Sequence, residues 1–352
     1  MTLSETLQAI QPPCAESIAG ATHRFSQIAA PLGALGLLQE AVIQIAGAQR
    51  RIIPELDRRA VVVFCADNGV VAQGVTQSEQ DVTAIVTENL SKGLTSVCLM
   101  AAHENVEVIP VDIGVAMPVG GAKLVRRKIA PGTRDMTLEP AMTREQAVQA
   151  LEVGIEMAEN CAARGVQILC AGEMGIGNTT SSAAITAALL SVPPVEITGR
   201  GAGLSSEGLR RKVDAIERAL ARANPDPADP LGVLSEVGGF DIAGMAGLYL
   251  GGARCGIPSV IDGVIAQVAA LVAVRLCPTV RDYLLFAHKS AEPASRLLLA
   301  ELNARPFIDA GMRLGEGTGA VAGLALLDLG LAVYRGMPLF DETDIETYVP
   351  LT

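Results

Sequence analysis

The chain has 352 residues, of which 50% are hydrophobic and 18% are charged. It is long enough for one large domain plus a smaller one, and too apolar for a disordered polyelectrolyte. Its formal net charge of -11 and its lack of a basic stripe argue against nucleic-acid binding. The N-terminus does not resemble a signal peptide, and the longest apolar run, 264–274, is too short to span a bilayer. Seven scattered cysteines without a Cys-x-x-Cys pair are typical of free thiols in a reducing compartment, so we expect a cytoplasmic protein.

Strand and helix patterns alternate along the chain after a mainly helical N-terminal segment. Short apolar runs predict buried strands at 61–66, 106–111, 166–170 and 257–261. Helical spacing predicts helices over 41–48, 82–90 and 143–163. Thr143 and Gln146 form a plausible capping box at the start of the third helix. The Pro- and Asp-rich stretch 224–230 predicts a loop.

Polar or glycine-rich residues follow each predicted strand. These turns begin at Asp67, Asp112, Gly172 and Asp262. In open α/β sheets, ligands bind in the crevice beyond the carboxyl ends of the strands. The pattern therefore predicts an α/β fold, with a doubly wound, mainly parallel sheet flanked by helices and a site at those strand ends.

Two glycine-rich segments have the composition of anion-binding loops. In 172–182, glycines precede hydroxyl and amide side chains at the start of an Ala-rich helix, so backbone N–H groups could hold an anion. A tight turn with a polar cap explains that segment equally well. The second segment, 199–206, is weaker, and a flexible loop is slightly favoured. Lys212 follows it in a charge run, which is usually a solvated helix face.

Glu316 lies between Gly315 and Gly317, ahead of an apolar helix. Glycines on both sides leave its carboxylate open to a ligand. An isolated Glu at this position more often complements the helix dipole, and the dipole lowers the pKa of the carboxyl group. A general base instead needs a raised pKa, which requires a dry pocket.

The segment from His288 to Glu292 is either a polar site or a surface turn. His23 and His103 lack metal-ligand spacing, so no metal site is assigned.

The ordered set of motifs resembles the nicotinate-nucleotide–dimethylbenzimidazole phosphoribosyltransferase family over nearly the whole chain. The motifs are 65–70, 172–180, 212–214, 237–241, 253–256, 262–263, 290–292 and 314–317. A dinucleotide-binding oxidoreductase is a poor alternative, because no Gly-x-Gly-x-x-Gly run follows the first predicted strand.

The resemblance implies a homodimeric enzyme that transfers phosphoribose from nicotinate mononucleotide to 5,6-dimethylbenzimidazole or a related base. The products are nicotinate and the α-ribazole 5′-phosphate of the cobamide lower ligand, and no cofactor is implied. Two domains are expected. Residues 59–305 form a large α/β domain, and residues 1–58 and 306–352 together form a small helical domain built from both chain ends. The segment 306–352 also carries the loop of Glu316.

Residue roles are carried over only at positions that match the family motifs. Glu316 matches the general base, for a reaction that inverts C1 of the ribose, and Glu173 matches a second active-site carboxylate. The implied substrate-binding residues are Ser78, Gly175, Gly177, Asn178, Thr179, Thr180, Gly201, Gly203, Lys212, Asp241, Asp262 and Gly315.

Several positions depart from the family pattern. Asn68 stands where the family commonly has His, and the other departures are Ala34, Leu37, Gln39, Val86 and the stretch 79–80. They cluster on the side of the lower-ligand base, so they bear on base preference and leave the Glu316 and phosphate segments intact. The alternative function is a weakly active paralogue that serves as a subunit of a heteromeric enzyme and uses phenolic bases.

Overall fold

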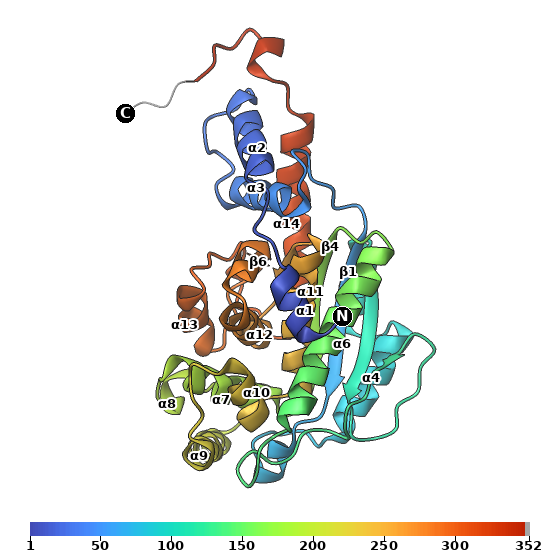
Figure 1. Ribbon diagram of the computed structural model, residues 1–352, viewed down its shortest axis with the longest axis vertical. Coiled ribbons are helices and arrows are strands. Elements are labelled where there is room, and N and C mark those ends of the chain that lie inside the picture. The colour runs from blue at the N-terminus through green and yellow to red at the C-terminus, as the bar shows by residue number, and fades with distance from the viewer. Residues whose placement is uncertain (349–352) are drawn as a thin grey trace.

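A computed structural model of the chain describes residues 1–348. Its centre is a six-stranded sheet with every pairing parallel and the order β3-β2-β1-β4-β5-β6 (Figure 1). The strands are β1 (Arg59–Ala66), β2 (Glu107–Gly114), β3 (Val125–Arg126), β4 (Ile168–Met174), β5 (Ser259–Ile261) and β6 (Leu284–Phe286). Strand order changes direction between β1 and β4, as in doubly wound sheets. The predicted fold class is confirmed.

Strand β1 shows why helices cover both faces of the sheet. Successive side chains of a strand point to opposite faces. Ala60, Val62 and Phe64 belong to one buried apolar cluster, and Val61 and Val63 belong to a second. A strand that is apolar on both faces must be buried on both.

Helices from both halves of the chain form the two covering layers (Figure 1). The first cluster contains residues of α6 (Arg144–Ala163), α7 (Asn178–Leu190), α9 (Ser206–Ala223), α10 (Pro230–Val237), α11 (Phe240–Cys255) and α12 (Val264–Leu276). The second contains residues of α2 (Ala15–Gln27), α3 (Leu37–Gln49), α4 (Asp81–Lys92), α5 (Ser96–His103) and α14 (Thr318–Gly336). The remaining helices are α1 (Leu3–Ala9), the short α8 (Pro194–Ile197) and α13 (Ala294–Glu301).

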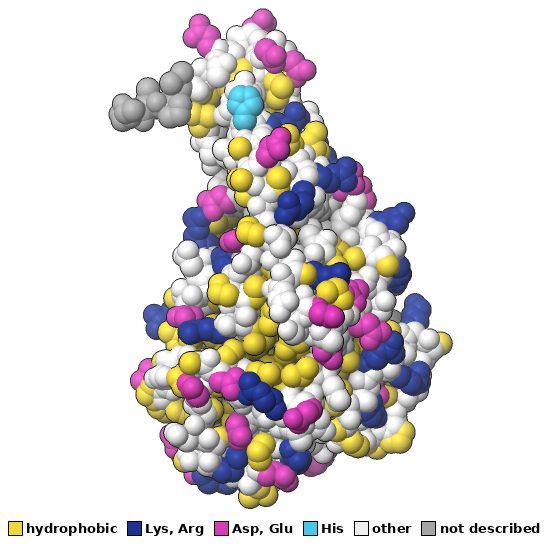
Figure 2. Space-filling model, viewed as in Figure 1, with side chains coloured by type: hydrophobic (Ala, Val, Ile, Leu, Met, Phe, Trp, Pro, Cys, Tyr) yellow, Lys and Arg dark blue, Asp and Glu magenta, His cyan; other side chains and the backbone are white. Residues whose placement is uncertain are grey.

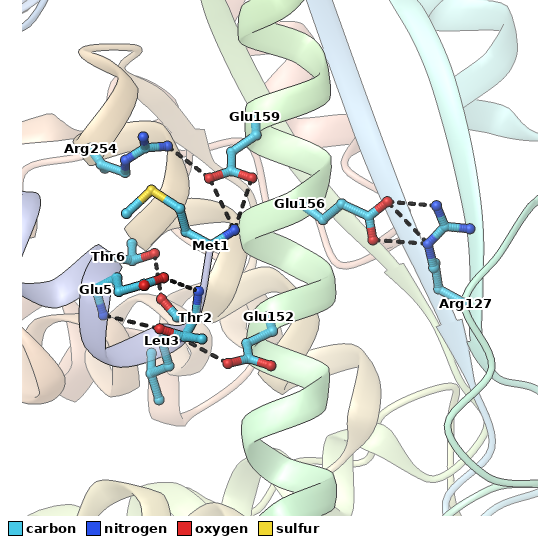
Figure 3. A network of polar contacts seen from close by, with 10 residues as sticks. All are labelled: Met1, Thr2, Leu3, Glu5, Thr6, Arg127, Glu152, Glu156, Glu159 and Arg254. Carbon is cyan, nitrogen blue, oxygen red and sulfur yellow. Dashed lines mark hydrogen bonds and ion pairs between the residues drawn. The ribbon is translucent and has the colours of Figure 1, made fainter.

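The two chain ends meet in helices: α2 and α3 lie beside the far end of α14 (Figure 1). The boundary at residue 58 is wrong for α1, which packs on α6 and α11 of the large domain. Figure 3 shows the polar contacts that hold it there. The Met1 ammonium lies 3.3 Å from Glu159, and the Leu3 N–H donates to Glu152 at 3.0 Å. Leu3 is also buried in the large-domain core.

The predicted elements correspond to observed ones. The four predicted strands are β1, β2, β4 and β5, and the three predicted helices are α3, α4 and α6. The capping box of Thr143 and Gln146 is confirmed, with both reciprocal hydrogen bonds formed. Strands β3 and β6 were not predicted, and the two residues of β3 are too few for a periodic signal.

Helix α14, at 19 residues, is longer than the apolar run 264–274. By length and hydropathy it is the one described helix that could cross a bilayer. Half of its most apolar window is buried within the protein, as in a core helix. On the face shown in Figure 2, Lys and Arg side chains alternate with Asp and Glu, without a continuous basic stripe.

Candidate active site

A pocket opens beyond the carboxyl ends of β4, β5 and β6. It is lined by 75–78, 173–179, 200–202, 262–266 and 313–316, with Leu204, Lys212, His288, Ser290 and Glu292. Parallel strands bring their carboxyl ends to one edge, so loops far apart in the sequence meet there. The site location expected from the sequence matches this pocket.

Most of the predicted site residues line the pocket. They are Glu316, Glu173, Ser78, Gly175, Gly177, Asn178, Thr179, Gly201, Lys212, Asp262 and Gly315. Three others are placed outside the lining. Thr180 and Asp241 are fully buried behind it, and Gly203 uses its carbonyl oxygen to accept a hydrogen bond from Gln77.

The glycine-rich turn between β4 and α7 forms the pocket floor. Gly177, the N-cap of α7, has a φ of 96°, a conformation that glycine adopts at little cost. A Cβ on Gly175 would lie 2.4 Å from the carbonyl oxygen of Ala66, so only glycine fits against β1. The amino end of α7 therefore begins at the pocket wall, where its backbone N–H groups and dipole favour an anion.

Lys212 lies inside the protein, and the solvated-face interpretation of this charge run is wrong for it. Its neighbours Arg210 and Arg211 are exposed, whereas Lys212 is 1% exposed. The ammonium donates to Thr179 Oγ1 at 2.8 Å and to the Gly199 carbonyl oxygen at 3.2 Å. Burial lowers the pKa of Lys212 to about 8, and the charge of Glu292 opposes this shift.

Glu173 belongs to a buried carboxyl cluster below the pocket. Its Oε2 accepts a hydrogen bond from Asn178 Nδ2, which also donates to Asp241 Oδ2 at 3.0 Å. Burial raises the pKa of Glu173 well above its usual range, and the negative charge of Asp241 adds to the effect. Burial likewise raises the pKa of Asp241 to about 6. Both shifts favour the protonated carboxylic acid.

Glu316 lies in a strained loop on the rim of β4. Gly315, Glu316 and Gly317 all have positive φ, at 92°, 61° and 91°. Glu316 lies directly before Gly317, the N-cap of α14. The Glu316 carboxylate accepts a hydrogen bond from the Val97 N–H, in the first turn of α5, at 3.1 Å.

Gly172 determines how close this loop approaches the sheet. A Cβ on Gly172 would lie 2.1 Å from the carbonyl oxygen of Glu316 and 2.8 Å from the backbone nitrogen of Gly317. The loop thus rests directly on the backbone of β4, and any larger residue at 172 displaces it. The sequence motif indicated that glycine matters here, but not which segment it contacts.

Asp262 and His288 support the same loop from β5 and β6. The Asp262 carboxylate accepts hydrogen bonds from the backbone N–H groups of Gly317, Gly319 and Ala320 at 3.1, 2.7 and 3.1 Å. His288 Nε2 lies 3.3 Å from Asp262 Oδ1, and both side chains are buried. The polar-site interpretation of 288–292 is favoured over a surface turn, since His288, Ser290 and Glu292 line the pocket.

Some lining residues were missed by sequence reasoning. They include Gln77, Arg200 and Arg313, which add polar or cationic groups to the walls. Arg200 adjoins the second glycine-rich segment and Arg313 nearly adjoins Gly315, so proximity to the glycine runs was the available signal. The departures Ala34, Leu37, Gln39 and Val86 do not line this pocket. Asn68 is fully buried beneath it and accepts from Ser181 Oγ at 2.8 Å.

A parallel sheet with a pocket, a glycine-rich turn and carboxylates at the carboxyl ends of its strands is typical of an α/β enzyme. A family model described as "Phosphoribosyltransferase" matches residues 10–345. The chain is 42% identical over 348 residues to the nicotinate-nucleotide–dimethylbenzimidazole phosphoribosyltransferase of Acetivibrio thermocellus, covering 99% of both chains. It is 43% identical over 345 residues to the enzyme of that name from Geobacter metallireducens, covering 98% of both.

The fold agrees with a solved structure of the same kind. The crystal structure of CobT from Thermus thermophilus matches with a TM-score of 0.89 and 43% identity, over 93% of this chain and 98% of that one. The protein is therefore a phosphoribosyltransferase. It belongs to the nicotinate-nucleotide–dimethylbenzimidazole phosphoribosyltransferase family.

Proposed function

We propose that this enzyme transfers 5-phosphoribose from nicotinate mononucleotide to 5,6-dimethylbenzimidazole or a related base. The products are α-ribazole 5′-phosphate and nicotinate. The observation that carries the proposal is that the Glu316 loop and the buried cation Lys212 line one pocket, so that a proton acceptor and a phosphate anchor face the same substrate.

The phosphate end of the nucleotide is assigned to Lys212 and the amino end of α7. A chain of net charge -11 repels a phosphate ester overall, so the anion needs local positive potential. The buried ammonium supplies one charge, and the Thr179 hydroxyl and the dipole at the amino end of α7 lie beside it.

Glu316 is assigned as the general base of the transfer. The azole nitrogen attacks C1 of the ribose from the face opposite nicotinate, so the anomeric centre inverts and nicotinate leaves with the bonding pair. The carboxylate takes the azole N–H proton as the new bond forms, and help of this kind contributes about 10²–10⁴-fold. Holding both substrates in line accounts for a further part of the rate.

Glu173 has a different role because its environment differs. Burial and the charge of Asp241 favour its protonated form, so it acts as a hydrogen-bond donor within the pocket. The Glu316 carboxylate accepts a hydrogen bond from the Val97 N–H at the start of α5, whereas Glu173 lies beside the negative charge of Asp241.

The residues in which this chain departs from the family pattern bear on which base the enzyme prefers. Asn68 is fully buried under the pocket floor, where family members commonly carry His. The test is to incubate the enzyme with nicotinate mononucleotide and a panel of benzimidazoles, purines and phenols, and to identify products by mass. We expect α-ribazole 5′-phosphate from the benzimidazole. Products from phenols only, or turnover that requires a co-expressed paralogue, would support the heteromeric alternative instead.

The assembly and location are also proposed. The enzyme works as a homodimer, as the family resemblance implies, and it works in the cytoplasm, which its seven free thiols support. Light scattering of the purified chain should give twice the monomer mass of 36.4 kDa. A monomer that becomes larger only with a paralogue contradicts the homodimer.

A further inference from the structure

The loop that carries Glu316 has a backbone conformation that it would not adopt by itself. Three consecutive residues have positive φ, and only the middle one, Glu316, has a side chain. For a residue with a Cβ, this left-handed region is unfavourable, and such strain persists only where the surroundings enforce it. Glycines at 315 and 317 permit the loop but do not select this conformation over others.

Asp262 is the group that selects it. The N-cap of α14 is Gly317, which has no side chain to bond the free backbone N–H groups of the first turn. Asp262 replaces that cap from a different strand, with Oδ2 accepting from Gly317 and Oδ1 accepting from Gly319 and Ala320. Because Gly317 directly follows Glu316, these bonds fix the point at which the Glu316 backbone must turn.

His288 in turn fixes Asp262. Its Nε2 lies 3.3 Å from Asp262 Oδ1, and Asp262 and His288 are both 3% exposed. A Cβ on Gly319 would lie 2.0 Å from His288 Cδ2 and 2.6 Å from Asp262 Oδ1, so the helix start is built around the pair. The fully buried Gln267 also holds the main chain here, donating to the His288 carbonyl oxygen at 3.2 Å.

We propose that Asp262 and His288 act as a pair of positioning residues that hold Glu316 in its working orientation, rather than as groups that bind substrate. This inference rests on the proposed role of Glu316. It gives His288 a function and changes the role that the family resemblance implied for Asp262. A base displaced by about 1 Å can lose on the order of 100-fold in rate, so a small relaxation of this loop is costly.

Two amide substitutions at position 288 provide the sharpest test. Gln carries its amide nitrogen near the position of Nε2, whereas Asn carries it near that of Nδ1. His288→Gln keeps a donor toward Asp262 and should retain kcat within about threefold. His288→Asn also carries an amide, but its nitrogen does not reach Asp262, so kcat should fall about 10–100-fold. Both should leave the KM for nicotinate mononucleotide within about twofold, since Lys212 is untouched.

Asp262→Asn provides the second kinetic test. It presents an NH₂ group to backbone donors that need an acceptor, and it should lower kcat in the same way with little change in KM. A large rise in the KM for nicotinate mononucleotide in this variant would overturn the positioning role and restore direct substrate binding.

Hydrogen exchange supplies a readout that does not depend on turnover. Backbone amides of 315–321 should exchange at least about tenfold faster in His288→Asn than in His288→Gln, while the amides of β1 stay protected in both. Equal exchange and equal kcat in the two variants would overturn the inference. Glu316→Gln, assayed beside them, separates the two proposals: if it retains turnover, the role of Glu316 fails. If it alone loses turnover, only the positioning pair fails.

Discussion

Lys212 Nζ lies 2.8 Å from Thr179 Oγ1, which joins the middle of α9 to the first turn of α7. The contact places a buried ammonium beside the amino end of a helix, so two sources of positive potential meet on one wall of the pocket. Each alone is a common feature of proteins, whereas their combination within a pocket is suited to a phosphate.

Lys212→Met tests the phosphate assignment. A hydrogen-bonded charge pair contributes about 1.5–3 kcal/mol, so the KM for nicotinate mononucleotide should rise roughly 10–100-fold. The KM for the azole should change far less, because the azole carries no phosphate. Steady-state kinetics with each substrate varied in turn measures both. Arg210→Met, an exposed change on the same helix, is the matched control, and equal losses for both substrates would contradict the assignment.

The same side chain predicts a pH dependence. Burial lowers the pKa of Lys212 to about 8, so the ammonium of the free enzyme loses its proton as the pH rises past that value. The KM for nicotinate mononucleotide should therefore increase between about pH 7.5 and pH 9, while the KM for the azole stays level. Lys212→Met should remove this dependence, and a parallel rise in the variant would assign the effect to another group.

Glu316→Gln should abolish most turnover and spare binding. The amide keeps the size of the side chain but cannot take the azole proton, so kcat should fall about 10²–10⁴-fold. Binding of nicotinate mononucleotide, measured by calorimetry, should stay within about threefold of the wild-type value. Glu207→Gln, on an exposed face of α9, is the control. Near-normal turnover in Glu316→Gln would remove Glu316 from the mechanism.

Gly172→Ala tests the packing of the Glu316 loop on β4. The new methyl group would lie 2.1 Å from the Glu316 carbonyl oxygen, so the loop must shift. We expect kcat to fall at least about tenfold, with a stability loss of about 1–3 kcal/mol from overpacking. Gly336→Ala has open space around its Cβ and should leave kcat and thermal unfolding unchanged. Unaltered kcat in Gly172→Ala would show that the loop tolerates displacement.

Asp241→Asn should make the protein more stable near neutral pH. Burial raises the pKa of Asp241 from 3.8 to about 6, so the folded state holds a proton that the unfolded state releases. The stabilising effect of that proton is complete below about pH 4 and is lost as the pH rises through 6. At pH 7.5 the ionised side chain therefore costs stability, on the order of 3 kcal/mol.

Urea unfolding of both proteins at pH 5 and pH 7.5 measures this cost. Asparagine has one acceptor oxygen, so it can accept from Asn178 but not also from the Ile242 N–H. That loss is the same at both pH values, so the change of the difference with pH isolates the charge. The variant should gain stability relative to wild type as the pH rises. A difference that is constant with pH, or that has the opposite sign, would contradict the raised pKa.

Much of the fold follows from local pattern. The apolar runs at β1, β2, β4 and β5 and the capping box at α6 are short-range signals, and the polar turns after the strands predicted the edge at which the pocket lies. Strand β3 lacked such a signal because it is two residues long, and β6 was not predicted. The position of α1 was also missed, since its partners on α6 and α11 lie more than a hundred residues away.

For the site, the sequence by itself determined, through its family resemblance, which segments to consider: the glycine-rich turns, Glu316 between its glycines, and Lys212 within a charge run. Only the tertiary structure decided what each group does. Lys212 is buried, and Asp241 is buried and accepts a hydrogen bond from Asn178. Asp262 accepts from the Gly319 N–H, 57 positions further along the chain, and so caps α14. Hydrogen bonds and burial depend on partners that are distant in sequence and near in space, so no local pattern could supply them.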